Sequence, residues 1–213
     1  MPLLLLLRHA ENDYVKTGRL AGRLPGVHLN ERGQKQAHEL AEGLSNLPIK
    51  AIYSSPLERA LETAAPLAEK LGLQVNIRES LIETDVGEWS GQELKSLRKH
   101  PAWKSVQQTP SRFRFPAGES FQECQTRLVT GIESLCASHN DNEIIACVTH
   151  ADPIKLLIAY YLGMPLDNFQ RLACDTASVT ILALSGKGMI LLKSNQRTPF
   201  NFSPPPLKTR AKK

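Results

Sequence analysis

The sequence lacks the features that mark disulfide-stabilised, exported or membrane-embedded proteins. Its four cysteines are scattered and form no Cys-x-x-Cys pair, so we expect them to be small buried hydrophobic residues in a reducing compartment. The leucine run at 3–7 is too short for the apolar part of a signal peptide, and no other run approaches membrane-spanning length. We therefore expect a cytoplasmic protein without a membrane partner.

The chain also has little excess of either charge outside its last residues. Its 213 residues carry a formal net charge of +5, and four of the cations lie in residues 201–213, which contain no acidic residue. Residues 1–200 therefore carry only the remaining +1, which argues against nucleic acid as a partner. We expect one domain over 1–200, followed by a disordered basic tail over 201–213.

Hydrophobic periodicity predicts alternating strands and helices in this domain. Strands are expected at 3–7, 51–54, 75–77, 144–149, 179–184 and 189–193. Helices are expected after a cap at Asn30, from Ser54-Ser55-Pro56 to Gly72, and over 94–108, 119–137 and 153–162. Alternation of this kind favours a three-layer α/β/α sandwich with a mostly parallel central sheet.

Histidine and arginine residues follow the ends of three predicted strands. Arg8 and His9 come directly after the first strand, and His150 comes directly after the strand at 144–149. Arg59 lies in the first turn of the helix that follows the second strand. Because the carboxyl ends of parallel strands share one edge of a sheet, we expect these side chains to converge there.

This combination of side chains favours phosphoryl chemistry. Arg8 and Arg59 would clamp phosphoryl oxygens, because a guanidinium group stays charged and binds two oxygens at once. The same arginines would keep His9 neutral, and therefore able to act as a covalent nucleophile. His150 would donate to the phosphoryl oxygens as charge develops on them. A carboxyl group would protonate the leaving oxygen. The loop at 81–91 offers three: Glu83, Asp85 and Glu88.

Other routes to phosphoryl transfer lack their motifs in this chain. No cysteine is followed by arginine six positions later, and there is neither an Asp-x-Asp pair nor a Gly-x-x-x-x-Gly-Lys-Ser/Thr loop. Dense groups of histidine and carboxylate residues are also missing. We therefore expect a reaction that needs no metal and no other cofactor.

Six segments in chain order resemble motifs of the histidine phosphatase superfamily, which is also described as phosphoglycerate mutase-like. They are 7–11 (LRHAE), 29–37 (LNERGQKQA), 54–64 (SSPLERALETA), 83–91 (ETDVGEWSG), 118–120 (GES) and 148–152 (VTHAD). The resemblance covers about residues 3–195. Segments 25–29, 150–155 and 169–172 look like a bacterial branch of inferred phosphomutases within this superfamily.

The resemblance implies a role for each of eight residues. His9 would be the phosphorylated nucleophile and Glu83 the proton donor, and this choice of Glu83 over its neighbours rests on the family pattern. Arg8, Arg59 and His150 would form the phosphate pocket. Three further positions would contact the substrate: Asn12, Gly22 and Ala151.

Departures from the family pattern bear on which reaction takes place. Ala10 replaces the usual glycine after the histidine, and Val15 stands where an asparagine that contacts phosphate is common. The segment between Trp89 and Gly118 is short beside the insertion of glycolytic mutases, which favours a phosphatase that admits water. A phosphomutase is the first alternative, and a non-catalytic protein that binds a phosphorylated ligand or acts as a scaffold is the second.

The expected partner is a small phosphorylated metabolite. Its leaving group does not follow from the sequence, because the predicted site is defined only at its phosphate end. A homodimer is also considered, since the hydrophobic segment at 156–164 suits either the core or a dimer face.

Overall fold

The computed structural model describes residues 2–185 and 188–200, and it contains a six-stranded sheet in the order β3-β2-β4-β1-β5-β6. The strands are β1 (Leu3–Arg8), β2 (Ile49–Ser54), β3 (Val75–Ile77), β4 (Ile144–Thr149), β5 (Val179–Ser185) and β6 (Gly188–Gln196). The first four strands pair in parallel, whereas β5 and β6 are antiparallel to their neighbours. The predicted tail at 201–213 lies outside the described residues.

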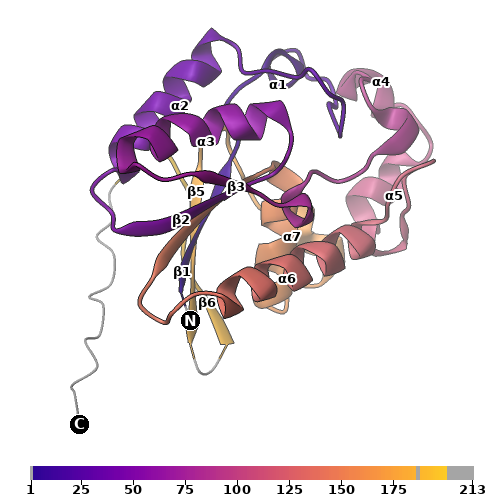
Figure 1. Cartoon of the computed structure of the whole chain (residues 1–213). Coiled ribbons are helices and arrows are strands. Elements are labelled where there is room, and N and C mark those ends of the chain that lie inside the picture. Colours follow the sequence, from indigo (N-terminus) through magenta and orange to yellow (C-terminus); the bar gives the residue numbers. More distant parts are fainter. Residues whose placement is uncertain (1, 186–187, 201–213) are drawn as a thin grey trace.

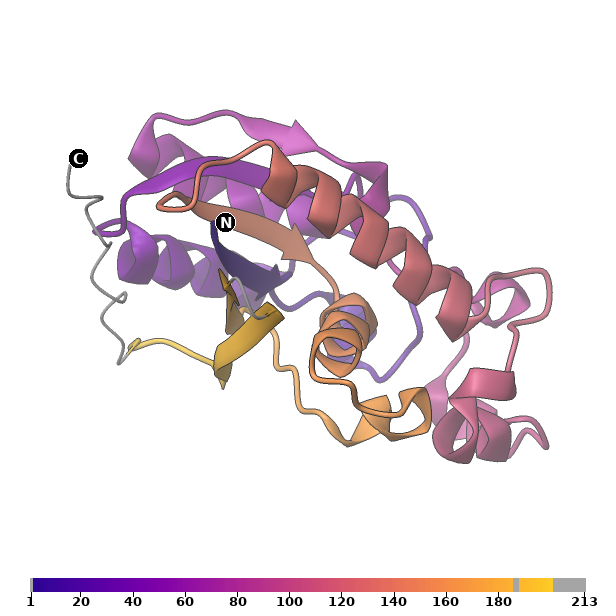
Figure 2. The ribbon, with the colours of Figure 1, turned by 90° about the horizontal axis from the view of Figure 1, so that it is seen from below.

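Helices cover both faces of the sheet (Figures 1 and 2), which confirms the predicted three-layer α/β/α sandwich. The helices are α1 (Asp13–Lys16), α2 (Glu31–Leu44), α3 (Glu58–Leu71), α4 (Leu94–Leu97), α5 (Trp103–Gln108), α6 (Phe121–Ala137) and α7 (Ala151–Tyr161). Helices α2 and α3 pack on one face, while α6 and α7 pack on the other. Short 3-10 turns lie at Glu79–Leu81, Gly87–Trp89, Pro110–Arg112 and Leu166–Arg171.

The leucine run of β1 supplies both halves of the core. Successive side chains of a strand point to opposite faces of the sheet, so the run divides into two sets. Leu3, Leu5 and Leu7 pack with residues of α2 and α3, whereas Leu4 and Leu6 pack with residues of α6 and α7. Leu4 to Leu7 are completely buried. An uninterrupted apolar strand is therefore what a central position between two helical layers requires.

Several element boundaries agree with the sequence prediction. The Asn30 side chain accepts a hydrogen bond from the Gly33 backbone at 2.9 Å, which caps α2 as predicted. Gly72 ends α3 in the left-handed conformation with a φ of 63°. The four cysteines are buried and free, as expected.

Other predicted boundaries are wrong. Helix α3 begins at Glu58, later than expected, and it has no side-chain cap because the cap position is occupied by Leu57. The predicted helix over 94–108 is two short helices, α4 and α5, and the interruption between them contains Pro101. No helix is expected between the first strand and Asn30, but the single-turn helix α1 lies there.

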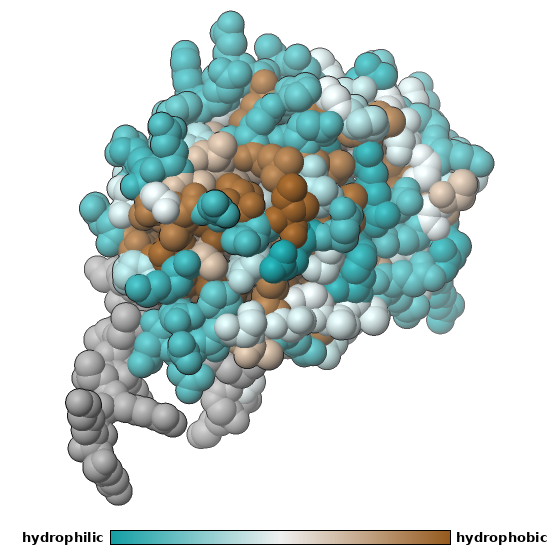
Figure 3. All heavy atoms as spheres, in the orientation of Figure 1, coloured by the Kyte–Doolittle hydropathy of each residue, from teal (hydrophilic) through white to brown (hydrophobic). Residues whose placement is uncertain are grey.

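The segment considered for a dimer face is largely core. Leu156 to Ala159 are completely buried, while Tyr160 and Leu162 at the end of α7 are about half exposed. Apolar side chains also gather over β2 and β3 (Figure 3), where Ile77 is 51% exposed. No helix among residues 2–185 and 188–200 is long and apolar enough to cross a membrane.

Replacing one core leucine tests the role of β1 in stability. We expect Leu5→Ala to lower the free energy of unfolding by about 2–5 kcal/mol, because it removes methyl groups from the face packed against α2 and α3. Urea unfolding followed by circular dichroism measures this change. Leu162→Ala is the matched control, since its side chain is 47% exposed, and an equal loss in both variants would contradict the argument.

Candidate active site

The ends of β2, β4 and β1 lie next to one another in the sheet, and a cavity of about 210 Å³ opens beside them. Its wall includes seven of the eight residues singled out from the sequence: Arg8, His9, Asn12, Gly22, Arg59, Glu83 and Ala151. The eighth, His150, is completely buried behind the wall, and its ring centroid lies 5.1 Å from that of His9. The structure therefore brings all eight residues together.

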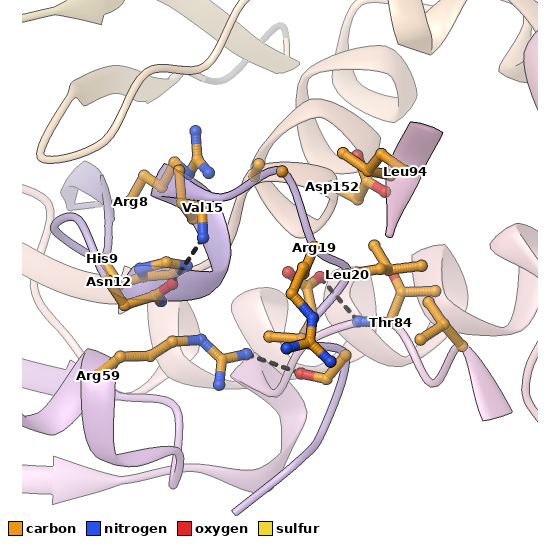
Figure 4. Close-up of a pocket in the computed structure, with 16 residues that line it drawn as sticks. Arg8, His9, Asn12, Val15, Arg19, Leu20, Arg59, Thr84, Leu94 and Asp152 are labelled. Carbon is orange, nitrogen blue, oxygen red and sulfur yellow. Dashed lines mark hydrogen bonds between the residues drawn. The ribbon is translucent and has the colours of Figure 1, made fainter. Parts of the chain in front are cut away.

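One end of the cavity is rich in buried nitrogen donors (Figure 4). Arg59 is 1% exposed, and its Nη2 donates a hydrogen bond to the Gly22 carbonyl. Its Nε and Nη1 have no partner among the described residues. Arg8 donates to the Cys174 carbonyl at 2.7 Å and keeps Nε unpaired, and Nδ2 of Asn12 is unpaired too. Unpaired buried donors are costly, so such a cluster is suited to an anion with several oxygen atoms.

His9 has the protonation state that a nucleophile needs. Burial, then the charges of Arg8 and Arg59, lower its pKa well below the usual value, so the ring is neutral near pH 7. Its Nδ1 lies 2.7 Å from the carbonyl oxygen of Ala10, which can only accept, so we assign the proton to Nδ1. The lone pair of a neutral imidazole then lies on Nε2.

His150 is oriented by Ser55. Burial, followed by the charges of Arg59, His9 and Arg8, lowers its pKa well below the usual value, so this ring is neutral as well and carries a single N–H. Its Nε2 lies 2.8 Å from the hydroxyl of Ser55, which also accepts from the Leu57 backbone. If the hydroxyl donates to Nε2, the proton of His150 lies on Nδ1, 3.8 Å from a carboxyl oxygen of Glu83.

The side chain of Glu83 lies at the cavity wall with a raised pKa. Burial, and then the charge of Asp152, raise its pKa to about 7, against the opposing charge of Arg59. The Thr84 backbone donates to one of its carboxyl oxygens at 2.8 Å. A carboxyl group with this pKa can act as an acid and then as a base near neutral pH.

Glu119 fixes the loop that carries Glu83. One of its oxygens accepts from Arg23 at 2.9 Å, from Arg127 at 2.8 Å and from the Asp85 backbone at 2.9 Å. Arg23 also donates to the Glu83 carbonyl, and Arg127 donates to the Ile82 carbonyl. The loop that carries Glu83 is therefore tied to α6 through Arg127 and to the segment between α1 and α2 through Arg23.

Gly22 cannot be replaced by a larger residue without moving the cavity wall. Its φ of 53° is unfavourable for other residues, and an added Cβ would lie 2.5 Å from Val86. The close approach brings its carbonyl to Arg59 and holds that guanidinium in place.

Sequence reasoning missed three residues of this site. Ser55 was interpreted as a helix cap, although its hydroxyl bonds to His150. Arg19 and Asp152 line the cavity beyond its donor-rich end. Asp152 follows His150 by two residues in the same motif, which was the available signal, whereas nothing in the pattern distinguished Arg19 from other loop cations.

No group of three or more metal-ligating side chains is present among residues 2–185 and 188–200. The arrangement instead combines fixed guanidinium groups, a neutral imidazole with a free lone pair, and a carboxyl group that can exchange a proton. Together with the α/β/α fold, these features define a phosphoryl-transfer enzyme.

The sequence profile of the histidine phosphatase superfamily, branch 1, matches residues 4–197, and the chain belongs to this family. It is 34% identical to phosphoserine phosphatase 1 of Hydrogenobacter thermophilus over 92% of both chains. It is 29% identical to the 2,3-bisphosphoglycerate-dependent phosphoglycerate mutase of Thermoplasma acidophilum, over 85% of this chain and 87% of that one. The expected superfamily is thus confirmed, and the chain is a phosphatase or phosphomutase.

A solved relative shows that the whole fold is shared. The structure of a mycobacterial glucosyl-3-phosphoglycerate phosphatase in complex with VO3 superimposes with a TM-score of 0.83 at 29% identity. The match covers 92% of this chain and 99% of that one.

The contact between Ser55 and His150 can be tested by removing the hydroxyl. We expect Ser55→Ala to lower kcat for a phosphate ester by about tenfold or more with a smaller change in KM, because His150 loses the partner that selects its tautomer. Steady-state kinetics measures the split, and 15N NMR of the histidine rings reports the tautomer.

Ser45→Ala is the matched control, since the Ser45 hydroxyl donates to the Glu42 carbonyl on the surface, away from the cavity lining. An unchanged His150 tautomer in Ser55→Ala would show that the hydroxyl does not select it.

Proposed function

We propose that the protein is a metal-independent phosphatase that hydrolyses a small phosphomonoester through a phosphohistidine intermediate on His9. The observation that carries this proposal is the hydrogen bond from His9 Nδ1 to the Ala10 carbonyl, which leaves Nε2 with a lone pair beside two arginines. A neutral, oriented imidazole is the nucleophile that such a reaction needs.

In the first step, His9 Nε2 attacks phosphorus and the bond from phosphorus to the ester oxygen breaks. Arg8, Arg59 and the Nδ1–H of His150 stabilise the charge on the three equatorial oxygens. Glu83 gives its proton to the leaving oxygen, so an alcohol departs rather than an alkoxide.

In the second step, water attacks the phosphorus of phosphohistidine. Glu83, now a carboxylate, accepts a proton from that water, and His9 leaves with its lone pair restored. Phosphate is released, and both side chains return to their starting protonation states. A pKa of about 7 suits Glu83 to both steps.

The size of the cavity favours a small substrate. Its volume of about 210 Å³ lies below the roughly 300–1,000 Å³ typical of sites for drug-sized ligands. One relative described above is named for phosphoserine, a phosphate ester with a short polar leaving group, whereas the mycobacterial relative is named for a larger glucosylated ester.

A phosphomutase is the second candidate, favoured by the likeness to the phosphoglycerate mutase of T. acidophilum. Such an enzyme would pass the phosphoryl group from His9 to a second hydroxyl instead of water. Transfer to added 3-phosphoglycerate without release of phosphate would favour this candidate over the phosphatase.

Replacing the nucleophile tests the intermediate. We expect His9→Ala to lower phosphate release by about 10³-fold or more, because the covalent route is lost. Wild-type protein quenched during turnover should carry acid-labile phosphate on His9, whereas His38→Ala, an exposed histidine variant, should behave as wild type. Excess chelator should leave turnover unchanged. Loss of activity with chelator, restored by added metal, would refute the metal-independent mechanism.

Replacing the proton donor tests the role of Glu83. Its acid form prevails below a pH of about 7, so kcat/KM for an alkyl phosphate should fall as the pH rises through that value. Glu83→Gln should remove this dependence and lower kcat/KM about 10²–10⁴-fold for an alkyl phosphate. The loss should be smaller for p-nitrophenyl phosphate, whose leaving group needs no proton. Glu88→Gln, in an exposed carboxylate of the same loop, is the control, and equal losses for both esters would contradict the assignment.

A further inference from the structure

The cavity is divided into two chemically different ends (Figure 4). Arg8, His9 and Arg59 lie at the end where buried donors gather. Asp152 and Leu94 lie across the cavity from them. A carboxylate repels a phosphate dianion, so Asp152 does not suit the phosphate end of the substrate. It is placed to contact the leaving group instead.

The carboxylate of Asp152 has capacity for one more donor. Its Oδ1 accepts from the ammonium of Lys155 at 3.0 Å, while none of the described residues donates to Oδ2. The ammonium of Lys155 also bonds to Gln170 at 3.1 Å and lies over the ring of Phe169, and these contacts hold it on the side of Asp152 away from the cavity. Lys155 does not line the cavity, so the pair presents its negative member to the substrate.

The leaving group must pass close to Asp152. The ester oxygen has to reach Glu83 to be protonated, and Glu83 and Asp152 line the same cavity of about 210 Å³. In so small a cavity, the leaving-group atoms just beyond the ester oxygen lie within reach of the Asp152 carboxylate. A positive substituent at that point is attracted by Asp152, and a negative one is repelled.

Arg19 offers the complementary charge at the mouth of the cavity. Its Nε and Nη2 both donate to the Gly91 carbonyl, at 3.0 and 2.7 Å, and its guanidinium lies 5.1 Å from the ring centroid of Tyr14. These contacts fix an exposed cation on the cavity wall. A carboxylate on the leaving group would bind there rather than at Asp152.

We propose that Asp152 selects phosphate esters whose leaving group carries an ammonium group two carbons from the ester oxygen. The substrate class is thus a phosphorylated amino alcohol, and a phosphorylated hydroxyamino acid would place its carboxylate at Arg19. This inference rests on the proposed phosphatase function and adds the leaving group to it. A phosphorylated acid without an ammonium group is disfavoured, because it would bring a second anion to Asp152.

Matched esters test the selection. O-phosphoethanolamine and propyl phosphate have the same chain length and differ in an ammonium in place of a methyl group, whereas phosphoglycolate places a carboxylate nearby. We expect the wild-type kcat/KM for phosphoethanolamine to exceed that for propyl phosphate by about tenfold or more. Phosphoglycolate should be the poorest of the three.

The variant Asp152→Asn should bring the phosphoethanolamine to propyl phosphate ratio close to one. We use the ratio of the two kcat/KM values as the readout. Any effect of Asp152 on the pKa of Glu83 changes both kcat/KM values by the same factor and therefore cancels in the ratio. Glu69→Gln, an exposed carboxylate on α3, should keep the wild-type ratio. Arg19→Gln should lower kcat/KM for phosphoserine relative to phosphoethanolamine.

A wild-type ratio near one, or a ratio that Asp152→Asn leaves unchanged, would overturn the selection and leave Asp152 as a structural partner of Lys155. The wild-type ratio decides the matter even if the variant fails to fold. Absence of hydrolysis of all three esters and of p-nitrophenyl phosphate would instead count against the proposed phosphatase.

Discussion

The site depends on keeping two buried histidines neutral beside two arginines. Burial opposes a charge on His9 and His150, and the neighbouring guanidinium groups oppose it further. A neutral imidazole has one donor and one acceptor, so the tautomer decides what each ring can do. The Ala10 carbonyl directs the lone pair of His9 outward, whereas Ser55 favours an N–H of His150 toward Glu83. Two identical side chains thereby acquire different chemistry through one hydrogen bond each.

The fold provides the rigidity that these tautomers require. Strand β1 is buried between two helical layers, and the backbone of His9 continues its ladder by donating to the Thr149 carbonyl. The Ala10 backbone donates to the Thr63 hydroxyl on α3, so the turn after β1 is fixed from a second side. The register of β1 against β4, in which Arg8 pairs with Thr149, sets the height of His9 at the sheet edge.

The sequence was sufficient for the fold and for the residues that follow strands. An apolar run ending in Arg8 and His9, repeated by the strand before His150, places these residues at one edge through topology alone. Ser55 and Asp152 could not be assigned in this way, because their roles depend on which side chains cross from neighbouring strands and loops. A serine before a proline is an ordinary helix signal, and only the position of His150 in the fold gives its hydroxyl another partner. Short helices such as α4 were equally hard to predict, since tertiary contacts rather than periodicity sustain them.

The pKa of Glu83 is raised although several arginines lie near it. Arg59 opposes protonation, and two further arginines, Arg23 and Arg127, bond to backbone carbonyls of the same loop. Glu119 forms ion pairs with both Arg23 and Arg127, at 2.9 and 2.8 Å, and so balances part of their positive charge. Burial, and then the negative charge of Asp152, raise the pKa of Glu83 to about 7. The arginines that hold the loop are thus paired with Glu119, while burial beside a second carboxylate keeps the proton donor able to exchange its proton near neutral pH.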